Sequence, residues 1–371
     1  MFEKEKVRLN LSGKIDESYD IYFGIDVFLD IADSLRKKMP ASRYAIITDS
    51  NVEKLHANRF KKILDGAKIV SDIFVLPAGE ENKSAENCLK VIGQMARKGY
   101  ARDSAVIALG GGLVGDMAGF IASIYGRGIP FVQIPTTLLA QTDSAVGGKT
   151  GVDTKEGKNL IGTFCQPTEV FVDVATLRTL AQNELINGIA EVIKHGMIRD
   201  YVFFKYLEKN ISKLLKRDEN VLLEISRRNC ELKGEVVELD AHEKGLRQIL
   251  NYGHTIGHAI EKIGKYKIPH GQCVAIGMAV EGIIASKITK FPLKQLEEQN
   301  RLIVAAGLPL KIPLGMSNEE ILKQTLIDKK ARNGKARYAL PLSIGKMEDF
   351  GGVYSTEVDS KIVEAAIDAC R

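Results

Sequence analysis

Three of the six histidines lie close together in the sequence, with a spacing that suits a metal site. His254 and His258 are four residues apart and would project from one face of a helix, and His270 follows within the same stretch. A catalytic zinc site keeps three protein ligands and one open position. Glu191, in the apolar helical pattern "GIAEVIKHG", is a further candidate, because a buried carboxylate is costly unless it is paired or bound to a metal. Spacing alone leaves open which histidines bind, and a Glu191–Lys194 ion pair is the alternative.

Two familiar motifs are excluded at single positions. A zinc peptidase of the H-E-x-x-H type would need glutamate at position 255, where the chain has Thr255. The stretch "SAVGGKTGVDTKEGKN" looks like a Walker A loop, but that spacing requires a glycine where Asp143 stands. An acidic side chain there would face the phosphates, so this stretch is not expected to be an ATP-binding loop.

A second glycine-rich stretch, "VIALGGGLVGD", predicts a nucleotide site. Gly110, Gly112 and Gly115 match G-x-G-x-x-G where an apolar strand meets a helix. Glycines let the backbone approach a pyrophosphate, and the helix N-terminus donates its free amides. The alternative is a tight turn with no ligand. The match lies on about the third strand and no acid follows at the usual distance, so Asp49, at the end of an earlier strand, is the candidate for the ribose hydroxyls.

The elements that must position these groups differ between the two halves of the chain. Apolar runs typical of strands occur at 44–50, 71–79, 104–112, 131–137 and 169–177, with helical patterns between them. This alternation predicts a nucleotide-binding α/β domain with a mostly parallel sheet at 1–178. Helical periodicity dominates afterwards and predicts a helical metal- and substrate-binding domain at 179–371, in which only 336–346 resembles a strand.

Composition excludes several classes of function. The hydrophobic share is 45% and the net charge only +5, with basic residues scattered among 47 acids, so no nucleic-acid partner is expected. No apolar run reaches the length of a membrane span, and the N-terminal residues lack the apolar region of a signal peptide. Five cysteines without a C-x-x-C pair indicate free thiols in a reducing compartment. We therefore expect a soluble cytoplasmic protein.

Cationic and amide side chains gather in the same stretches as the glycines and histidines. A high density of such groups suits a small substrate that carries several negative charges. They are Arg127, Lys149, Lys158, Asn159, Lys194, Lys233, Arg247 and Asn251, together with Asp143.

Six long motifs carry a family resemblance: "GGGLVGDMAGF", "RGIPFVQIPTTLLAQTDSAVGGKTGV", "GKNLIGTFCQP", "GIAEVIKHG", "GLRQILNYGHTIGHAIE" and "HGQCVAIGM". From about residue 77 to 346 the chain resembles the 3-dehydroquinate synthase family of sugar-phosphate cyclases. The resemblance implies an N-terminal nucleotide-binding domain and a C-terminal helical metal domain. It also implies conversion of 3-deoxy-D-arabino-heptulosonate 7-phosphate to 3-dehydroquinate and phosphate, in the shikimate pathway. NAD is then used catalytically, a divalent metal (zinc or cobalt) is required, and a homodimer is expected.

The same resemblance assigns roles to individual residues. It implies that the metal ligands are Glu191, His254 and His270. The residues implied to hold NAD are Asp49, Gly79, Glu80, Lys83, Gly112, Gly115, Asp116, Thr136, Thr137, Lys149, Lys158, Thr176 and Thr179. The catalytic and substrate-binding residues would be Arg127, Asp143, Lys149, Asn159, Lys194, Lys233, Arg247, Asn251, His258 and Lys330. Among these, Arg127 would reach across a dimer, and Lys233 with Arg247 would meet the substrate carboxylate.

The chain also departs from the family pattern in places. Family members often have D-E-x-E before G-L-R, where this chain has Ala241 and His242 in the middle, and Gln272 stands where glutamate is frequent. A sister cyclase such as 2-deoxy-scyllo-inosose synthase is therefore a rival interpretation, although its substrate has no carboxylate to need Lys233 and Arg247. Two weaker rivals are an oxidoreductase of the glycerol dehydrogenase type and a non-catalytic nucleotide- or metal-binding protein.

Overall fold

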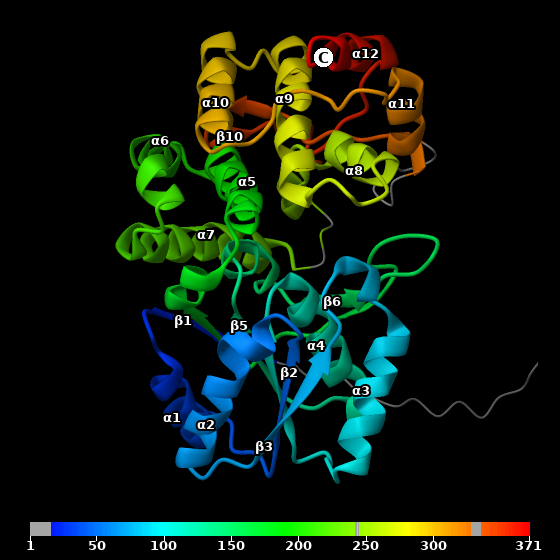
Figure 1. Cartoon of the computed structure of the whole chain (residues 1–371). Helices are drawn as coiled ribbons and strands as arrows, with labels where there is room; N and C mark the ends of the chain where they lie inside the picture. Colours follow the sequence, from blue (N-terminus) through cyan, green and yellow to red (C-terminus); the bar gives the residue numbers. More distant parts are fainter. Residues whose placement is uncertain (1–15, 242, 244, 328–334) are drawn as a thin grey trace, which may run out of the picture.

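The computed structural model describes residues 16–241, 243, 245–327 and 335–371. Its first half contains a six-stranded sheet in the order β1-β8-β5-β4-β2-β3, in which every pair of neighbours is parallel (Figure 1). The strands are β1 (Asp20–Gly24), β2 (Tyr44–Asp49), β3 (Ser71–Leu76), β4 (Ala105–Gly110), β5 (Phe131–Pro135) and β8 (Glu169–Asp173). The predicted parallel sheet is confirmed. The five predicted strands are present, and β1 is an additional edge strand.

Helices cover both faces of this sheet. They are α1 (Phe28–Lys38), α2 (Asn58–Gly66), α3 (Ala85–Arg97) and α4 (Gly112–Ile124). Ile46 and Ile107 of the central strands pack in one core cluster with α1 and α2, whereas Ala45 and Val106 belong to the cluster with α3 and α4. Strands buried on both faces are continuously apolar, which explains why their sequences are recognisable.

The order of the strands also defines where a nucleotide can bind. The chain crosses from β2 to β3 in one direction and then returns past β2 to β4, β5 and β8. In open parallel sheets, ligands bind outside the carboxyl ends of the strands where this direction reverses. Here that place lies beyond Asp49 of β2 and Gly110 of β4.

The second half is helical, as expected. It contains α5 (Gln182–Arg199), α6 (Tyr201–Leu215), α7 (Glu219–Leu239), α8 (His254–Ile263), α9 (His270–Ile288), α10 (Leu293–Ala305), α11 (Asn318–Ile327) and α12 (Ser360–Asp368). A small hairpin of β9 (Pro341–Ser343) and β10 (Lys346–Met347) confirms the late strand. A second hairpin, β6 (Lys149–Val152) with β7 (Ile161–Phe164), was not predicted. Short 3₁₀ and π helices complete the described elements: η1 (Glu53–Ala57), η2 (Glu80–Asn82), η3 (Tyr125–Arg127), η4 (Ala140–Ser144), η5 (Val174–Thr179) and η6 (Leu246–Asn251).

One large core joins the helices to the β1–β8 side of the sheet. Val170 and Val172 of β8 belong to the same buried cluster as residues of α5, α7, α8 and α9. Among the described residues, α9 alone is long and apolar enough to cross a membrane, but 72% of its apolar window is buried inside the protein, as in the core helix of a soluble protein. The boundary expected after residue 178 stays a prediction; β8 ends at Asp173 and α5 begins at Gln182.

Candidate metal and substrate site

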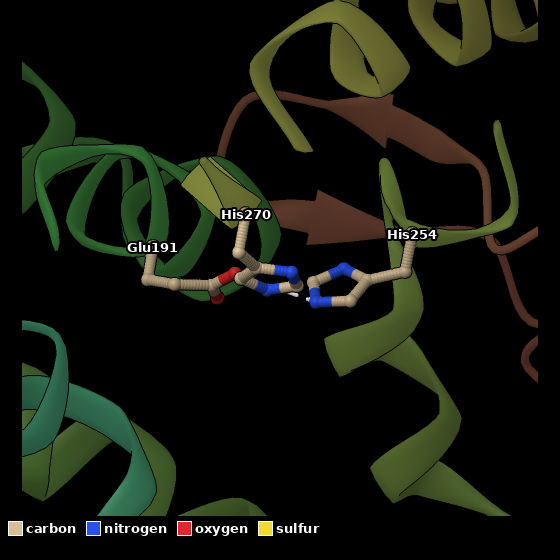
Figure 2. Close-up of side chains that lie close together, drawn as sticks. All are labelled: Glu191, His254 and His270. Atoms are coloured by element: carbon tan, nitrogen blue, oxygen red, sulfur yellow. Dashed lines mark ion pairs between the residues drawn. The ribbon is translucent and has the colours of Figure 1, made fainter. Parts of the chain in front are cut away.

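Three side chains from three helices converge on one point (Figure 2). Glu191 comes from the middle of α5 and is fully buried, while His254 and His270 are the first residues of α8 and α9. The Nε2 atoms of His254 and His270 lie 3.3 Å and 3.5 Å from Oε1 of Glu191. One ligand atom from each residue lies within 4.8 Å of the others. One carboxylate and two imidazoles at this separation form the donor set of a three-ligand divalent metal site.

The outer nitrogens of both imidazoles have acceptors, which fixes the orientation of the rings. Nδ1 of His254 lies 3.1 Å from the carbonyl oxygen of Tyr252, and Nδ1 of His270 lies 3.3 Å from Oε2 of Glu261. Each Nδ1–H can therefore donate, which leaves the Nε2 lone pair directed toward Glu191. This is the arrangement in which neighbouring acceptors orient histidine ligands for a metal. Both carboxylate oxygens of Glu191 are buried, and their close partners among the described residues are the ammonium group of Lys194 and the imidazoles of His254 and His270. The residues present therefore fit a metal ion.

The charges around Glu191 agree with a site that holds its carboxylate ionised. Lys194 forms an ion pair with Oε2 of Glu191, so the ion pair and the histidine cluster coexist rather than exclude each other. Burial would raise the pKa of Glu191, but Lys194 and His254 together lower it well below its ordinary value. Burial likewise lowers the pKa of His270, but the carboxylates of Glu191 and Glu261 raise it to about 9. A metal ion would thus have to displace a proton from this cluster.

A cavity of about 710 Å³ opens beside the three histidines. Ten of the predicted site residues line it, and they come from both halves of the chain. These are Asp116, Asp143, Lys149, Asn159, Lys233, Arg247, Asn251, His254, His258 and His270. The cavity is large enough for a sugar phosphate and part of a nucleotide.

Lys233 and Asp143 form the most deeply buried charged pair of the lining. Nζ of Lys233 lies 2.6 Å from Oδ1 of Asp143 and also donates to its carbonyl oxygen. Burial would raise the pKa of Asp143, but Lys233 and Lys194 hold it well below its ordinary value. The buried His195, on α5, completes this group, with Nε2 3.6 Å from Asp143 Oδ1 and Nδ1 2.8 Å from Oδ1 of Asn229.

Two main-chain carbonyl groups hold the guanidinium of Arg247 in place. Its Nη1 donates to the carbonyl oxygen of Ala241 at 2.6 Å, and its Nη2 donates to that of Gly147 at 3.3 Å. Only 1% of Arg247 is exposed, and its Nε has no hydrogen-bond partner in the described chain. A guanidinium has five N–H donors, so these two contacts leave three for a ligand in the cavity.

Glu243 is a cavity residue that the sequence interpretation missed. It forms an ion pair with Lys149, and its Oε1 accepts a hydrogen bond of 3.0 Å from Nδ2 of Asn251. Two predicted substrate residues are thus held by one carboxylate. The sequence did point to this residue, because Glu243 occupies the position of the last glutamate in the family pattern D-E-x-E. Arg337, Gln248 and Ser355 also line the cavity and carried no such signal.

The predicted nucleotide residues lie at the carboxyl edge of the sheet. Gly112 is the first residue of α4, and a side chain at Gly115 would lie 2.7 Å from Oε1 of Gln133 on β5, so glycine permits the close packing of helix and strand. Oγ1 of Thr136 is buried without a hydrogen-bond partner in the described chain. Oδ1 of Asp49 accepts from the amides of two following residues.

Two lysines connect this edge to the cavity and to the metal cluster. Nζ of Lys83 lies 2.6 Å from both Oδ2 of Asp116 and Oδ1 of Asn159. Nζ of Lys158 lies 2.9 Å from Oε1 of Glu261 and 3.2 Å from Oε1 of Glu80. Because Glu261 also contacts His270, the nucleotide edge and the metal cluster share one carboxylate.

The remaining predicted residues lie outside the cavity lining. Thr176 donates to the carbonyl oxygen of Asp173, and Oγ1 of Thr179 lies 2.8 Å from Nε2 of His56. Gly79 and Thr137 lie just beyond β3 and β5. Arg127 is exposed, and Lys330 lies outside the described residues.

Comparison with known proteins connects this geometry to a family. The family model described as "3-dehydroquinate synthase N-terminal" matches residues 73–187, and that described as "3-dehydroquinate synthase C-terminal" matches 188–331. A 3-dehydroquinate synthase of Thermoanaerobacter sp. (strain X514) is 44% identical over 334 residues, 90% of this chain and 94% of that protein. Another, of Symbiobacterium thermophilum, is 41% identical over 358 residues, 96% of this chain and 99% of that protein.

The chain belongs to the 3-dehydroquinate synthase family. This confirms the resemblance and the fold class. Two solved structures from related cyclases have a TM-score of 0.87. A 2-deoxy-scyllo-inosose synthase complexed with carbaglucose-6-phosphate, NAD⁺ and Co²⁺ is 26% identical and covers 95% of this chain and 96% of its own. A 2-epi-5-epi-valiolone synthase from Streptomyces hygroscopicus subsp. jinggangensis 5008, with NAD⁺ and Zn²⁺ bound, is 27% identical and covers 98% and 99%.

Glycerol dehydrogenase of Schizosaccharomyces pombe shares the fold of the 3-dehydroquinate synthase family at a greater distance. Its TM-score is 0.66 and its identity 18%, with 96% of this chain and 91% of that chain covered. That likeness concerns the fold alone.

Proposed function

We propose that this chain is a 3-dehydroquinate synthase, which converts 3-deoxy-D-arabino-heptulosonate 7-phosphate to 3-dehydroquinate and phosphate. Relatives with that name at 41–44% identity support the proposal. The observation that carries it is one cavity lined both by Arg247 and Lys233 and by His254 and His270 of the Glu191–His254–His270 cluster. A substrate with a carboxylate, a phosphate and neighbouring hydroxyls would match these groups.

When bound, a zinc or cobalt ion at Glu191, His254 and His270 would supply a Lewis acid for a substrate hydroxyl, and NAD would supply a reversible hydride acceptor. The protein's own contribution is orientation, charge and exclusion of water. Lys194 balances the charge of Glu191 at the cluster. The buried Lys233 and the partly buried Asp143 form an ion pair near it, which holds both side chains in place.

The phosphate is assigned to a further group of lining residues. Lys149, Asn159, Asn251 and His258 offer cationic or amide donors there, and Lys330 is proposed to join them. Lys149 and Asn251 share Glu243 as a partner, so an incoming phosphate would exchange these contacts for its own oxygens. Charge-assisted hydrogen bonds of this kind favour the leaving of phosphate, because they stabilise the charge that develops on it.

The carboxylate is assigned to Arg247, with Lys233 as a second positive charge. Arg247 is fixed by two main-chain carbonyls and keeps three N–H donors, which suits planar recognition of a carboxylate. These two residues separate the proposal from its main rival, a sister cyclase that acts on a phosphorylated sugar without a carboxylate. That rival is retained because the solved structures with a TM-score of 0.87 include such an enzyme.

For NAD we propose the carboxyl edge of the sheet, within residues 1–178, and for metal and substrate the helical residues 179–371. The contacts proposed for NAD are Asp49, Gly79, Glu80, Lys83, Gly112, Gly115, Asp116, Thr136, Thr137, Lys149, Lys158, Thr176 and Thr179. We also propose a cytoplasmic homodimer, in which the exposed Arg127 reaches the substrate of the partner subunit.

One assay tests the function directly. Heptulosonate 7-phosphate and glucose 6-phosphate are offered separately with NAD and Co²⁺, and phosphate release is measured. Release from heptulosonate 7-phosphate supports the proposal. Release from glucose 6-phosphate alone would assign the chain to a sister cyclase.

A further inference from the structure

The helix that carries His254 begins without a capping side chain of its own. The residue before it, Gly253, has φ +78° and no side chain to accept a hydrogen bond from the first amides of α8. A Cβ atom at this position would lie 2.7 Å from Cγ of Met278 and 2.8 Å from the carbonyl oxygen of Val274. A serine or aspartate, the usual residues at a helix start, therefore does not fit here.

The missing acceptors come from the neighbouring helix α9. Glu281 is fully buried, and its Oε2 accepts a hydrogen bond of 2.7 Å from the amide of Gly253, while its Oε1 accepts one of 3.1 Å from the amide of Ile256. The two helices can approach closely enough because residue 277 is also glycine, and a side chain there would collide with the Gly253 carbonyl. A buried carboxylate on α9 thus replaces the local cap of α8.

Both of these amides lie beside His254 in the chain, one residue before it and two residues after it. The carbonyl that orients the imidazole, that of Tyr252, directly precedes them. Tyr252 is itself buried, and its hydroxyl donates to Oε1 of Gln299 at 2.6 Å. The backbone on either side of His254 is consequently held from α9 and α10, and the position of its Nε2 depends on these contacts.

The charge of Glu281 adds a second effect. The first turn of a helix carries a partial positive charge, which disfavours a cation near its end. His254 is the first residue of α8, so a divalent ion on its Nε2 would experience this repulsion. The charge of Glu191, moreover, is already balanced by Lys194. A buried carboxylate bonded to the first amides of α8 offsets the partial charge where a metal would lie.

We propose that Glu281 is a positioning residue for the metal site, acting through the start of α8 on His254. The inference rests on the proposed role of His254 as a metal ligand. It adds that the affinity for metal depends on a residue that does not touch the ion.

The test compares metal affinity with stability in matched variants. Glu281→Gln keeps the size of the side chain but removes its charge and one acceptor. The dissociation constant for Co²⁺ or Zn²⁺ is measured by competition with a chelator, and the unfolding of the metal-free protein by denaturant titration. Glu281→Gln should bind metal about 10- to 100-fold more weakly than the wild type.

Asp173→Asn is the matched control. Its carboxylate is also buried, and it accepts from the amides of Asp26 and Val27 at 2.8 Å and 3.1 Å at the start of α1, away from the histidine cluster. It should lower stability but leave the metal dissociation constant unchanged. Glu281→Asp, which keeps the charge with a shorter reach, serves if Glu281→Gln does not fold, and it should show an intermediate loss of metal affinity.

The two proposals fail in different ways. If the wild type binds metal and the Glu281 variants bind it equally tightly while losing stability, Glu281 is only structural and this inference is wrong. If the wild type itself binds no metal, the proposed metal site is wrong, and the inference falls with it.

Discussion

Replacement of Arg247 by alanine should damage recognition of the substrate carboxylate in a measurable and specific way. The guanidinium is 1% exposed, and three of its five N–H donors remain after its contacts to Ala241 and Gly147. A carboxylate that takes two of them loses two charge-assisted hydrogen bonds in the variant, each worth about 1.5–3 kcal/mol. The sum of about 3–6 kcal/mol corresponds to a loss of roughly 10²- to 10⁴-fold in kcat/KM, since 1.36 kcal/mol is a factor of ten.

The same substitution has a structural cost that must be measured apart from activity. It leaves the buried carbonyl of Gly147 without its donor, at about 1–3 kcal/mol, whereas Ala241 is exposed and its carbonyl can bind water instead. Denaturant unfolding of the metal-free protein should therefore show a lower stability, while metal and NAD content in the folded protein stay at wild-type levels. Arg247→Lys should recover only part of the activity, because an ammonium cannot reproduce the planar fork.

The decisive comparison uses a substrate analogue without the carboxylate. The wild type should turn it over poorly, and Arg247→Ala should lose little further on it, because the partner of the guanidinium is already absent. An equal loss on both substrates would refute the reasoning and give Arg247 a phosphate-binding or purely structural role. The assignment to 3-dehydroquinate synthase over its sister cyclases would then lose its main support at residue level.

Three further predictions concern the metal, the cofactor and the thiols. Elemental analysis of His258→Ala should still find bound metal. Replacement of a proposed ligand by alanine should remove both metal and turnover, at each of Glu191, His254 and His270. Phosphate release should proceed with NAD far below the substrate concentration, and a stoichiometric rise in NADH absorbance would instead indicate a dehydrogenase. Burial raises the pKa of the thiols of Cys88, Cys230 and Cys273 to about 12. An aromatic disulfide reagent at pH 8 should therefore label these thiols only after the protein is unfolded. Rapid labelling of any of them in the native protein would contradict the described packing.

The sheet was predictable from sequence where its strands are buried on both faces. The segments 44–50, 104–112 and 131–137 are predominantly apolar, because helices cover both sides of them. Strand β1 was missed since it lies at the sheet edge, where its residues are only partly buried and their pattern is weak. The β6–β7 hairpin was missed because glycines and lysines between 147 and 162 hide its short strands.

Ten of the expected site residues line the cavity, but the contacts between them were not predictable from sequence. Spacing could place His254 and His258 on one helix, yet only the tertiary fold brings Glu191 from α5 to Nε2 of His254. The partners of the predicted cations are also distant in the chain: Glu243 lies 94 residues from Lys149, and Glu261 lies 103 residues from Lys158. Interactions over such distances leave no periodic signal, and so the acidic half of each pair was not identified.

The two main-chain acceptors of Arg247 place opposite limits on how the sequence can diverge. Every amino acid supplies a carbonyl oxygen, so the residue at position 241 can change without losing its contact with the guanidinium. Position 147 has no such freedom, because its φ is +94° and a Cβ atom would lie 2.6 Å from Nη2 of Arg247. Substitution at Ala241 is thus neutral for this contact, whereas any substitution at Gly147 should displace the guanidinium itself.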